Sequence, residues 1–400
     1  MARNIITGID AGDRYIKIIV AERVSGSRYP KLLAAVKKES RGFRRGYVLE
    51  RNEAISSMQD ALRAAEKTSG HKIKSAFIAV GGAGLSSTTG DGNIIPSRAD
   101  AEITDYDMRR ALEAAEMKIP ESGNKEILDE IPLSYKLDGK KIIGTPRGMK
   151  SSRLEIKFLF ITYLKSYLDE LVSVVERCGV SVEREFPTAY GASFVSATRQ
   201  QKMAGCIVVD IGAANTDIAL FEEGLPHLVG SIDIGSQDIT HDIALGLKIS
   251  LEEAEEIKHD RSSRVFAQKK LEEIIEARLS DIFELIDEQL KKLSRSELLP
   301  AGIIITGGGA LIPKIETVAS RYLNLPARIA LPLFPQDAQV DPVRRKPDER
   351  LFINDPSFSA VYGLVIYAHN PHDQVFSGGG TFISPLLKDF RRWIKNLFWP

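Results

Sequence analysis

Two segments of this 400-residue chain place an aspartate in the same local setting. Residues 206–224 read CIVVDIGAANTDIALFEEG, and residues 5–20 read IITGIDAGDRYIKIIV. In both, an apolar strand ends at an Asp-x-Gly turn, at Asp210 or at Asp10, and a second strand follows. A carboxylate at such a bend can hold a hydrated magnesium ion, and the neighbouring glycine lets the backbone approach a phosphate. The two copies predict two related halves that face each other.

A third glycine-bearing turn extends this pattern. Residues 307–309 are three glycines that follow an apolar strand, where a glycine-rich helix start would let an adenosine approach the backbone. Taken singly, each turn is ordinary turn chemistry, but the three in this order predict a site for ATP with magnesium. The candidate residues are Asp10 and Asp210, which would hold the metal through water, and Gly12, Asp13, Lys17, Gly212, Ala213, Ala214, Asn215, Gly235, Gly307, Gly308 and Gly309 around the nucleotide.

The composition argues against several classes of protein. Lysine and arginine total 54, as do aspartate and glutamate, so the net charge is zero and no overall field attracts nucleic acid. The two cysteines, Cys178 and Cys206, indicate neither a disulfide framework nor a thiolate metal site, in keeping with a reducing cytosol. We expect no signal peptide, and no run of about 18 apolar residues suggests a membrane span.

The length and the order of elements predict an α/β protein with several subdomains, since single cores stop growing near about 250 residues. A helix over 265–293 carries an apolar stripe at spacings of three and four, which indicates a core position. A helix over 103–115 capped by Thr104, with strands at 142–144 and 154–162, indicates a separate α+β unit. The predicted parts are 1–83 with 164–198, the insert 84–163, 199–236 with 301–369, the helical part 237–300, a linker at 370–383 and a terminal helix at 384–400.

The terminal segment, SPLLKDFRRWIKNLFWP, has the pattern of an amphipathic helix. Ser384 is a good N-cap, and Pro385 at the first helical position costs no hydrogen bond. A helix in the plane of a membrane needs apolar residues in the acyl boundary and cations among anionic headgroups. The predicted membrane-contacting residues are Leu386, Leu387, Lys388, Phe390, Arg391, Arg392, Trp393, Ile394, Lys395, Leu397 and Phe398.

Apolar burial dominates the membrane affinity expected of this helix. A fully buried large side chain contributes ~1.5 to 3 kcal/mol, against ~1 kcal/mol for each basic residue near an anionic surface. One helix should therefore bind anionic lipids reversibly, and several on a polymer should bind tightly. The alternatives are that the helix packs on the body of the protein or in the groove of a partner.

The motifs resemble those of the actin, sugar kinase and heat-shock chaperone superfamily. Residues 4–20 and 206–221 resemble its two phosphate motifs, and 303–315 resemble its adenosine motif. PTAYGAS and AVYGLVI resemble its two connecting helices. Within the superfamily, the stretches RGYVLE, PRGMKSSRLE, IGSQDITHDIA and AEEIK, together with the insert, resemble the FtsA family of bacterial cell-division proteins.

The FtsA resemblance implies an actin-like, ribonuclease H-like fold of two duplicated domains, with an inserted α+β subdomain and a terminal amphipathic helix. It also implies a filament-forming scaffold at the cytoplasmic face of the cell membrane, at the division site. The implied partners are the FtsZ polymer, other division proteins and copies of the chain itself. Glu255 and Lys258 would contact the ribose, and the alternative for this pair is an exposed ion pair on a helix.

Three departures from the superfamily pattern argue against catalysis. Asp13 stands where a hydroxyl residue is usual, and a carboxylate about 4 Å from a phosphate charge costs about 4 kcal/mol unless magnesium, Arg14 or a turned-away rotamer intervenes. Residues 213–215, Ala-Ala-Asn, replace a Gly-Gly-Thr turn and add Cβ atoms near the phosphates. Phe186 stands where hydrolysing relatives orient the attacking water. We expect weak or absent nucleotide binding and negligible hydrolysis.

Two other functions stay open at this point. One is an ATP-hydrolysing kinase or chaperone, against which Phe186 and the altered turns count. The other is a pilus-assembly scaffold of the PilM type, against which the insert and the terminal helix count.

Overall fold

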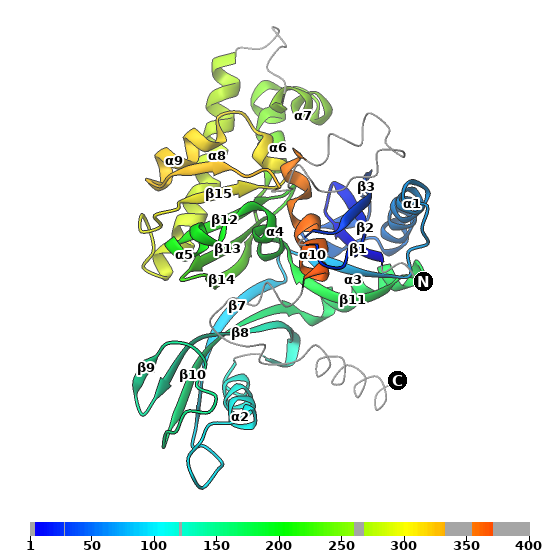
Figure 1. The fold of residues 1–400 in the computed structure, drawn as a ribbon. Helices are drawn as coiled ribbons and strands as arrows, with labels where there is room; N and C mark the ends of the chain where they lie inside the picture. Colours follow the sequence, from blue (N-terminus) through cyan, green and yellow to red (C-terminus); the bar gives the residue numbers. More distant parts are fainter. Residues whose placement is uncertain (1–4, 28, 120–121, 260–267, 333–353, 371–400) are drawn as a thin grey trace. The chain divides into compact units, whose positions relative to one another are not determined.

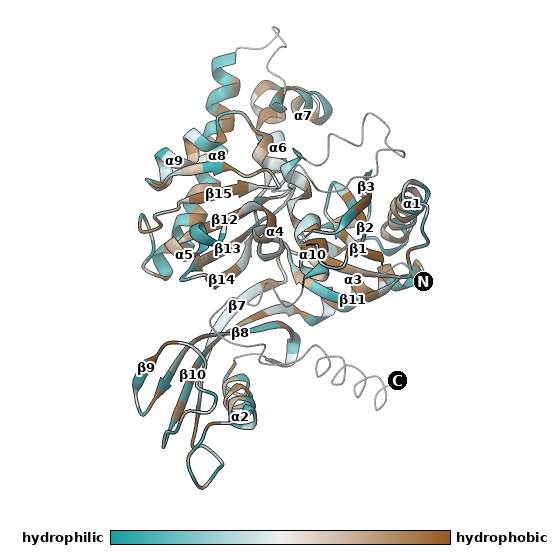
Figure 2. Ribbon diagram, in the orientation of Figure 1, coloured by the Kyte–Doolittle hydropathy of each residue, from teal (hydrophilic) through white to brown (hydrophobic). Residues whose placement is uncertain are grey.

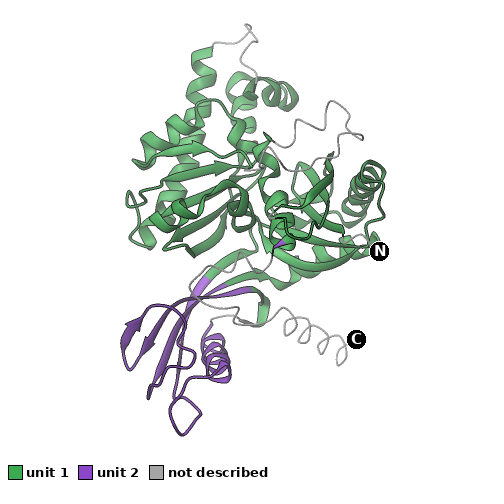
Figure 3. Cartoon of the chain, viewed as in Figure 1, with its two compact units in different colours: residues 1–87, 123–128, 161–369 green, residues 88–122, 129–160, 370–400 purple. Residues whose placement is uncertain are grey.

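A computed structural model describes most of the chain, and its element order is drawn in Figure 1. The described residues divide into two compact units, of which unit 1 lies within 1–87, 123–128 and 161–369, and unit 2 lies mainly within 88–122 and 129–160 (Figure 3). The described residues are 5–27, 29–119, 122–259, 268–332 and 354–370.

A five-stranded sheet forms the first half of unit 1. Its strands are β1 (Ile5–Ala11), β2 (Tyr15–Glu22), β3 (Lys31–Glu39), β6 (Ser75–Val80) and β11 (Ser181–Pro187), in the order β11-β6-β1-β2-β3. β1, β2 and β3 pair antiparallel, whereas β6 and β11 extend the sheet in parallel. The parallel strands require crossovers, which are supplied by helices α1 (Arg51–Ser69) and α3 (Lys165–Arg177). A small hairpin, β4 (Phe43–Arg44) and β5 (Tyr47–Val48), precedes α1.

The second half repeats this topology. Its strands are β12 (Cys206–Ile211), β13 (Thr216–Glu222), β14 (Leu225–Ile232), β15 (Ile303–Thr306) and β16 (Ala327–Ile329), in the order β14-β13-β12-β15-β16. Again three strands pair antiparallel and two extend the sheet in parallel. The two Asp-x-Gly hairpins therefore occupy equivalent places in two equivalent sheets, as the repeat predicted.

Two helices of small residues cross between the halves. They are α4 (Thr188–Ser196) and α10 (Ser359–His369), the predicted connecting helices. A Cβ at Gly363 would lie 1.8 Å from the carbonyl oxygen of Gly191, so glycine is required for this close approach. Figure 2 shows α10 as predominantly apolar, in keeping with its burial. α4 ends at Ser196, and a separate helix, α5 (Arg199–Ala204), begins after Thr198, whose side chain accepts a hydrogen bond from the Gln201 backbone.

A helical layer covers the second sheet. It contains α6 (Ser236–Leu247), α7 (Leu251–His259), α8 (Gln268–Lys292) and α9 (Ile315–Leu323). The predicted stripe of α8 is confirmed as core, since Leu279, Ile282, Phe283 and Ile286 are fully buried. The predicted start of this helix near residue 265 lies outside the described residues. One-turn 3-10 helices occur at Ser122–Asn124, Gly308–Leu311 and Pro356–Phe358.

Unit 2 is an α+β module. It contains most of β7 (Leu85–Ile94), β8 (Lys125–Leu137) and β10 (Leu154–Leu164), with the short β9 (Lys140–Ile142) and helix α2 (Asp105–Glu116). The strand order is β7-β10-β8-β9. Thr104 caps α2 as predicted, within a capping box completed by Asp107. The helix predicted from residue 103 accordingly begins at Asp105, because the cap residue itself is extended.

One predicted strand and the chain end need separate comment. The strand predicted over 142–144 ends at Ile142, and Ile143 is 99% exposed, because the chain leaves the sheet edge there. The predicted membrane helix at 384–400 and the linker, apart from Asn370, lie outside the described residues. Within the described part of the chain, no helix is both long and apolar enough to cross a membrane.

α5 buries a lysine against aromatic rings. Lys202 is 5% exposed, and its Nζ donates a hydrogen bond to Ser193 Oγ at 3.0 Å. The same Nζ lies 5.0 Å from the ring centroid of Phe194 and 4.8 Å from that of Phe221. The ring faces favour the cation, but burial outweighs them and lowers the pKa of Lys202 to about 7.

We expect this lysine to make the fold more stable as the pH rises from 7 to 9. The folded pKa lies below the ordinary value of 10.5, so the unfolded chain holds a proton that the folded chain has lost, and raising the pH favours folding. The gain is on the order of 2 kcal/mol in free energy of unfolding. Urea unfolding at both pH values measures it, and Lys202→Met should lack the increment. An unchanged pH dependence in the variant would contradict this account.

Candidate functional site

A cavity of about 640 Å³ is lined by both halves of unit 1. The hairpins β1–β2 and β12–β13 contribute most of its charged residues, and the glycine turn after β15 contributes Gly308 to its wall. The structure thus brings together predicted residues that are up to about 300 positions apart in the chain. The predicted residues that line it are Asp10, Gly12, Asp13, Lys17, Asp210, Gly212, Ala213, Asn215, Glu255 and Gly308.

The other predicted residues do not line this cavity. A Cβ at Gly307 would lie 2.4 Å from Asp210 Oδ1, and one at Gly235 would lie 2.4 Å from the Ala213 carbonyl oxygen. These glycines therefore let turns pack closely behind the wall. The residues placed away from the cavity are Ala214, Gly235, Lys258, Gly307 and Gly309.

The first hairpin carries an ion pair and an unsatisfied carboxylate. Lys17 Nζ lies 2.7 Å from Asp10 Oδ2. Burial opposes the ammonium charge, but Asp10 raises the pKa of Lys17 above its usual value. Asp13 Oδ1 accepts a weak hydrogen bond from the Gly46 backbone at 3.3 Å, while its Oδ2 is buried and has no partner among the described residues. Burial raises the pKa of Asp13.

The second hairpin places two carboxylates opposite each other. Asp210 pairs in register with Asp217, so the two side chains share one face of the sheet. Burial raises the pKa of Asp210 to about 7 and that of Asp217 to about 6. Asp217 Oδ1 accepts hydrogen bonds from the Gly82 backbone at 3.0 Å and from Asn215 Nδ2 at 3.1 Å.

Asp217 and Thr188 are cavity residues that the sequence motifs did not identify. The alternation of β13 contained a signal for Asp217, because a residue paired with Asp210 must face the same side. Burial is the larger effect on Asp217, and the neighbouring Ser231 and Thr188 side chains act against it by lowering its pKa. Two donors, the Gly82 backbone and the Asn215 amide, therefore bind Oδ1 of this carboxylate.

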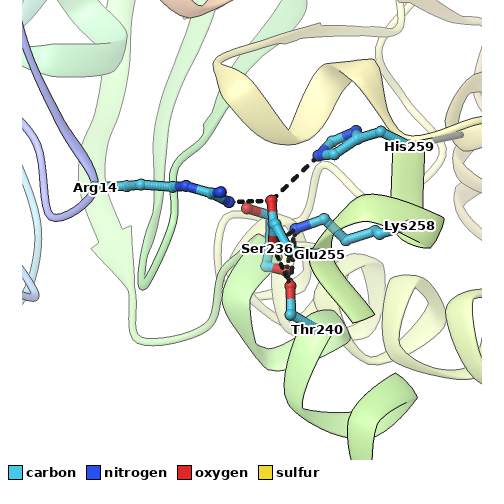
Figure 4. Close-up of polar contacts among 6 residues, drawn as sticks. All are labelled: Arg14, Ser236, Thr240, Glu255, Lys258 and His259. Carbon is cyan, nitrogen blue, oxygen red and sulfur yellow. Dashed lines mark hydrogen bonds and ion pairs between the residues drawn. The ribbon is translucent and has the colours of Figure 1, made fainter. Parts of the chain in front are cut away.

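Glu255 lies at the centre of a polar cluster (Figure 4). Its Oε2 accepts hydrogen bonds from Thr240 Oγ1 at 2.6 Å and Lys258 Nζ at 2.8 Å. Its Oε1 pairs with Arg14 from the first hairpin and lies 3.4 Å from His259 Nε2. Although burial opposes its charge, the contacts with His259, Lys258 and Thr240 hold the pKa of Glu255 well below its usual range.

The alternative of an exposed ion pair for Glu255 and Lys258 is wrong. Lys258 is 1% exposed, and its Nζ also donates to Thr240 Oγ1 at 2.9 Å and to the Ser236 carbonyl oxygen at 3.1 Å. Arg14 pairs with Glu255, so its guanidinium does not neutralise the Asp13 carboxylate.

Phe186 is buried outside the cavity. It is 1% exposed and its ring stacks on Tyr190, with centroids 5.2 Å apart and planes at 14°. Further ring contacts to Phe194 and Tyr367 place it in an aromatic cluster between α4 and α10. Phe186 therefore packs against other rings at the position where a polar side chain would be needed to orient an attacking water.

The cavity fits a nucleotide in size and in its glycine turn. Ligand cavities usually measure about 300 to 1,000 Å³. A Cβ at Gly308 would meet no atom within 4 Å, so this turn leaves open space beside the cavity. Asp10 and Asp210, one from each hairpin, are the oxygen ligands suited to a hydrated magnesium ion.

Comparison with known proteins identifies the family. The model for cell division protein FtsA matches residues 207–363, and the model for the SHS2 domain inserted in FtsA matches residues 82–162. The cell division protein FtsA of Borreliella burgdorferi is 31% identical over 393 residues, covering 92% of each chain. This chain belongs to the FtsA family. The FtsA of Pseudomonas aeruginosa is 27% identical and 98% of each chain is covered.

Solved structures confirm the actin-like fold. The PilM-PilN type IV pilus biogenesis complex matches with a TM-score of 0.66 at 17% identity, covering 91% of this chain and 98% of that chain. MreB5 of Spiroplasma citri bound to ADP matches with a TM-score of 0.51 at 13% identity, covering 93% and 99%. Both likenesses concern the fold alone, whereas the FtsA family match indicates a role in cell division.

We expect Glu255→Gln to destabilise the protein strongly, because it leaves the buried Lys258 ammonium without its counter-charge. The loss should be about 3 kcal/mol in free energy of unfolding at pH 7. The folded pKa of Glu255 is depressed, so its contribution to the free energy of unfolding is fully present above the ordinary glutamate pKa. That contribution is lost as the pH falls from the ordinary pKa through the lower, folded one. Urea unfolding measures both effects.

The matched control is Glu256→Gln, at the exposed neighbouring residue, which should change stability little. Lys258→Met in the Glu255→Gln background should restore part of the loss, because it removes the unpaired charge. Equal losses in the two Glu→Gln variants would contradict the assignment of Glu255 as the centre of the cluster.

Proposed function

We propose that this chain is an actin-like scaffold that links the FtsZ polymer to the cytoplasmic face of the membrane at the division site. The observation that carries this proposal is the match to FtsA over 92% of the chain, through both halves and the insert. Copies of the chain associate into filaments in this proposal, and other division proteins bind the assembled scaffold.

The proposed membrane contact is the segment 384–400. If this segment forms a helix, its sequence would place the apolar residues on one arc and the basic residues opposite, as an interfacial helix on an anionic bilayer requires. Filament formation strengthens this contact, because several weakly binding helices on one polymer act together.

We also propose that the cavity binds ATP with magnesium weakly and hydrolyses it negligibly. Support for binding comes from the size of the cavity and from its hairpin and glycine turns, and the actin-like MreB5 was solved with ADP and with AMPPNP. Bound magnesium would neutralise phosphate charge beside Asp10 and Asp210. Asp217 already accepts hydrogen bonds from Gly82 and Asn215, and Phe186 is buried away from the cavity, so neither is placed to activate a water.

Deleting residues 384–400 should abolish flotation with vesicles that contain anionic lipid, because the proposed apolar contact is lost. The full chain should float, and its flotation should persist at raised salt, since charge screening removes only the smaller electrostatic share. Trp393→Glu in the full chain is a milder test of the same face. Undiminished flotation of the truncated chain would show that another surface binds the membrane.

FtsZ recruitment separates the scaffold from the alternatives. FtsZ polymers should co-float only when the full chain is present, and the truncated chain should bind FtsZ without bringing it to the vesicles. Steady ATP turnover together with no binding to FtsZ would favour a kinase or chaperone.

A turnover assay tests the catalytic part of the proposal. We expect Mg-ATP binding by calorimetry but phosphate release no faster than in a blank without the protein, because the buried Phe186 contributes packing and positions no water. Multiple rapid turnovers by the unmodified chain would contradict it.

A further inference from the structure

β3 brings to the cavity a lysine that neither the motifs nor the family match assigns. Lys37 lines the cavity together with Asp10 and Lys17. Asp10 pairs in register with Lys17 on β2, and Lys17 pairs with Lys37 on β3. Directly opposed residues of antiparallel strands carry their side chains on the same face. The three residues therefore form one charged row across the first sheet, facing the cavity.

The row places two cations beside each other. Opposed like charges on neighbouring strands are destabilising, and such costs are typical of functional sites. Lys17 is neutralised by Asp10 at 2.7 Å, whereas Lys37 Nζ lies 3.4 Å from Asp355 Oδ2. Its hydrogen bond to Ser357 Oγ is also long, at 3.5 Å, and its Nζ makes a cation–π contact 4.7 Å from the ring centroid of Tyr15. An ammonium has three donors, so Lys37 keeps capacity for a further anionic partner.

The equivalent row in the second sheet carries no lysine, in contrast to the row formed by Asp10, Lys17 and Lys37 in the first sheet. The equivalent row on β12, β13 and β14 is Asp210, Asp217 and Ser231. Lys17 and Lys37 thus stand where the second half has a carboxylate and a hydroxyl. A polyphosphate beside so many carboxylates needs cations directed at it.

The other cavity cations on the hairpin are already committed. Arg14 pairs with Glu255, and Lys17 pairs with Asp10. Among Arg14, Lys17 and Lys37, which line the cavity from the first sheet and its hairpin, Lys37 differs in the length of its contacts. Its ammonium makes no hydrogen bond or ion pair shorter than 3.4 Å to the residues that the structure describes.

We propose that Lys37 binds the polyphosphate of the nucleotide, exchanging its long contact with Asp355 for a phosphate oxygen. This inference rests on the proposed binding of ATP. Its partner Asp355 caps the 3-10 turn before α10, accepting a hydrogen bond from the Ser357 backbone at 2.8 Å.

That turn is attached to the glycine turn on the adenosine side of the cavity. The Pro356 carbonyl oxygen accepts hydrogen bonds from the Gly307 backbone at 3.1 Å and from Thr306 Oγ1 at 2.9 Å. Lys37 therefore connects the strands that face the phosphates with the turn that would face the adenosine.

Calorimetric titration with Mg-ATP, Mg-ADP and adenosine tests the assignment. Lys37→Met should weaken ATP binding about tenfold or more, because a charge-assisted contact is lost. The effect on ADP should be smaller, and adenosine binding should not change. Lys38→Met is the matched control, since Lys38 is the exposed neighbour and faces away from the row. Lys37→Arg should restore most of the ATP affinity.

A second variant tests whether Lys37 exchanges Asp355 for a phosphate, and here the ATP affinity should rise instead of fall. Asp355→Asn removes the competing charge but keeps a side chain that can cap the turn, so ATP binding should become tighter. If Lys37→Met melts at a lower temperature than the unmodified chain, its weaker ATP binding could come from lost stability. Tighter ATP binding by Asp355→Asn would then still support the role of Lys37, and unchanged binding would contradict it.

The outcomes separate this inference from the function on which it rests. If the unmodified chain binds ATP and Lys37→Met binds it as Lys38→Met does, the role of Lys37 is overturned and nucleotide binding stands. An equal loss of ATP and adenosine binding in Lys37→Met would also overturn it, because that result describes a general disturbance of the cavity. If the unmodified chain binds none of the three ligands, both proposals fail.

Discussion

The burial of carboxylates where two duplicated sheets face each other is the constraint on which the rest of the structure depends. Asp210 and Asp217 lose their hydration there, and burial raises both pKa values. Carboxylates in such a place must be matched by donors or cations. The backbone of Gly82 and the amide of Asn215 donate hydrogen bonds to Asp217, and Lys17 forms an ion pair with Asp10 on the facing sheet. Much of the polar architecture of unit 1 follows from this requirement.

The same requirement ties the two halves together. Gly82 follows the first sheet and Asp217 belongs to the second, so their hydrogen bond joins the halves across the cavity. The ion pair of Arg14 with Glu255 makes a second connection, and the close crossing of α4 and α10 at Gly191 and Gly363 makes a third, apolar one. A chain that serves as a scaffold benefits from such connections, because they hold the halves in one arrangement. Chemistry on a bound nucleotide would instead require acceptors left free for water.

Several features could be read from the sequence because they depend on near neighbours. The hairpins around Asp10 and Asp210, the cap at Thr104 and the buried stripe of α8 were predicted and are confirmed. Features set by partners far along the chain were missed or misjudged. Lys258 is buried because Thr240 and Ser236 lie beside it, which the spacing to Glu255 does not reveal.

By itself the sequence determined the duplicated hairpins, the glycine turns and the membership of the FtsA family, because these depend on residue order and local periodicity. It also placed Phe186 where a water-orienting residue would stand. Only the tertiary structure decided that Phe186 packs in an aromatic cluster, that Arg14 pairs with Glu255 and that Lys37 joins the cavity wall. The physical reason is that burial and charge pairing are properties of surfaces brought together by folding, and strand register alone decides which side chains share a face.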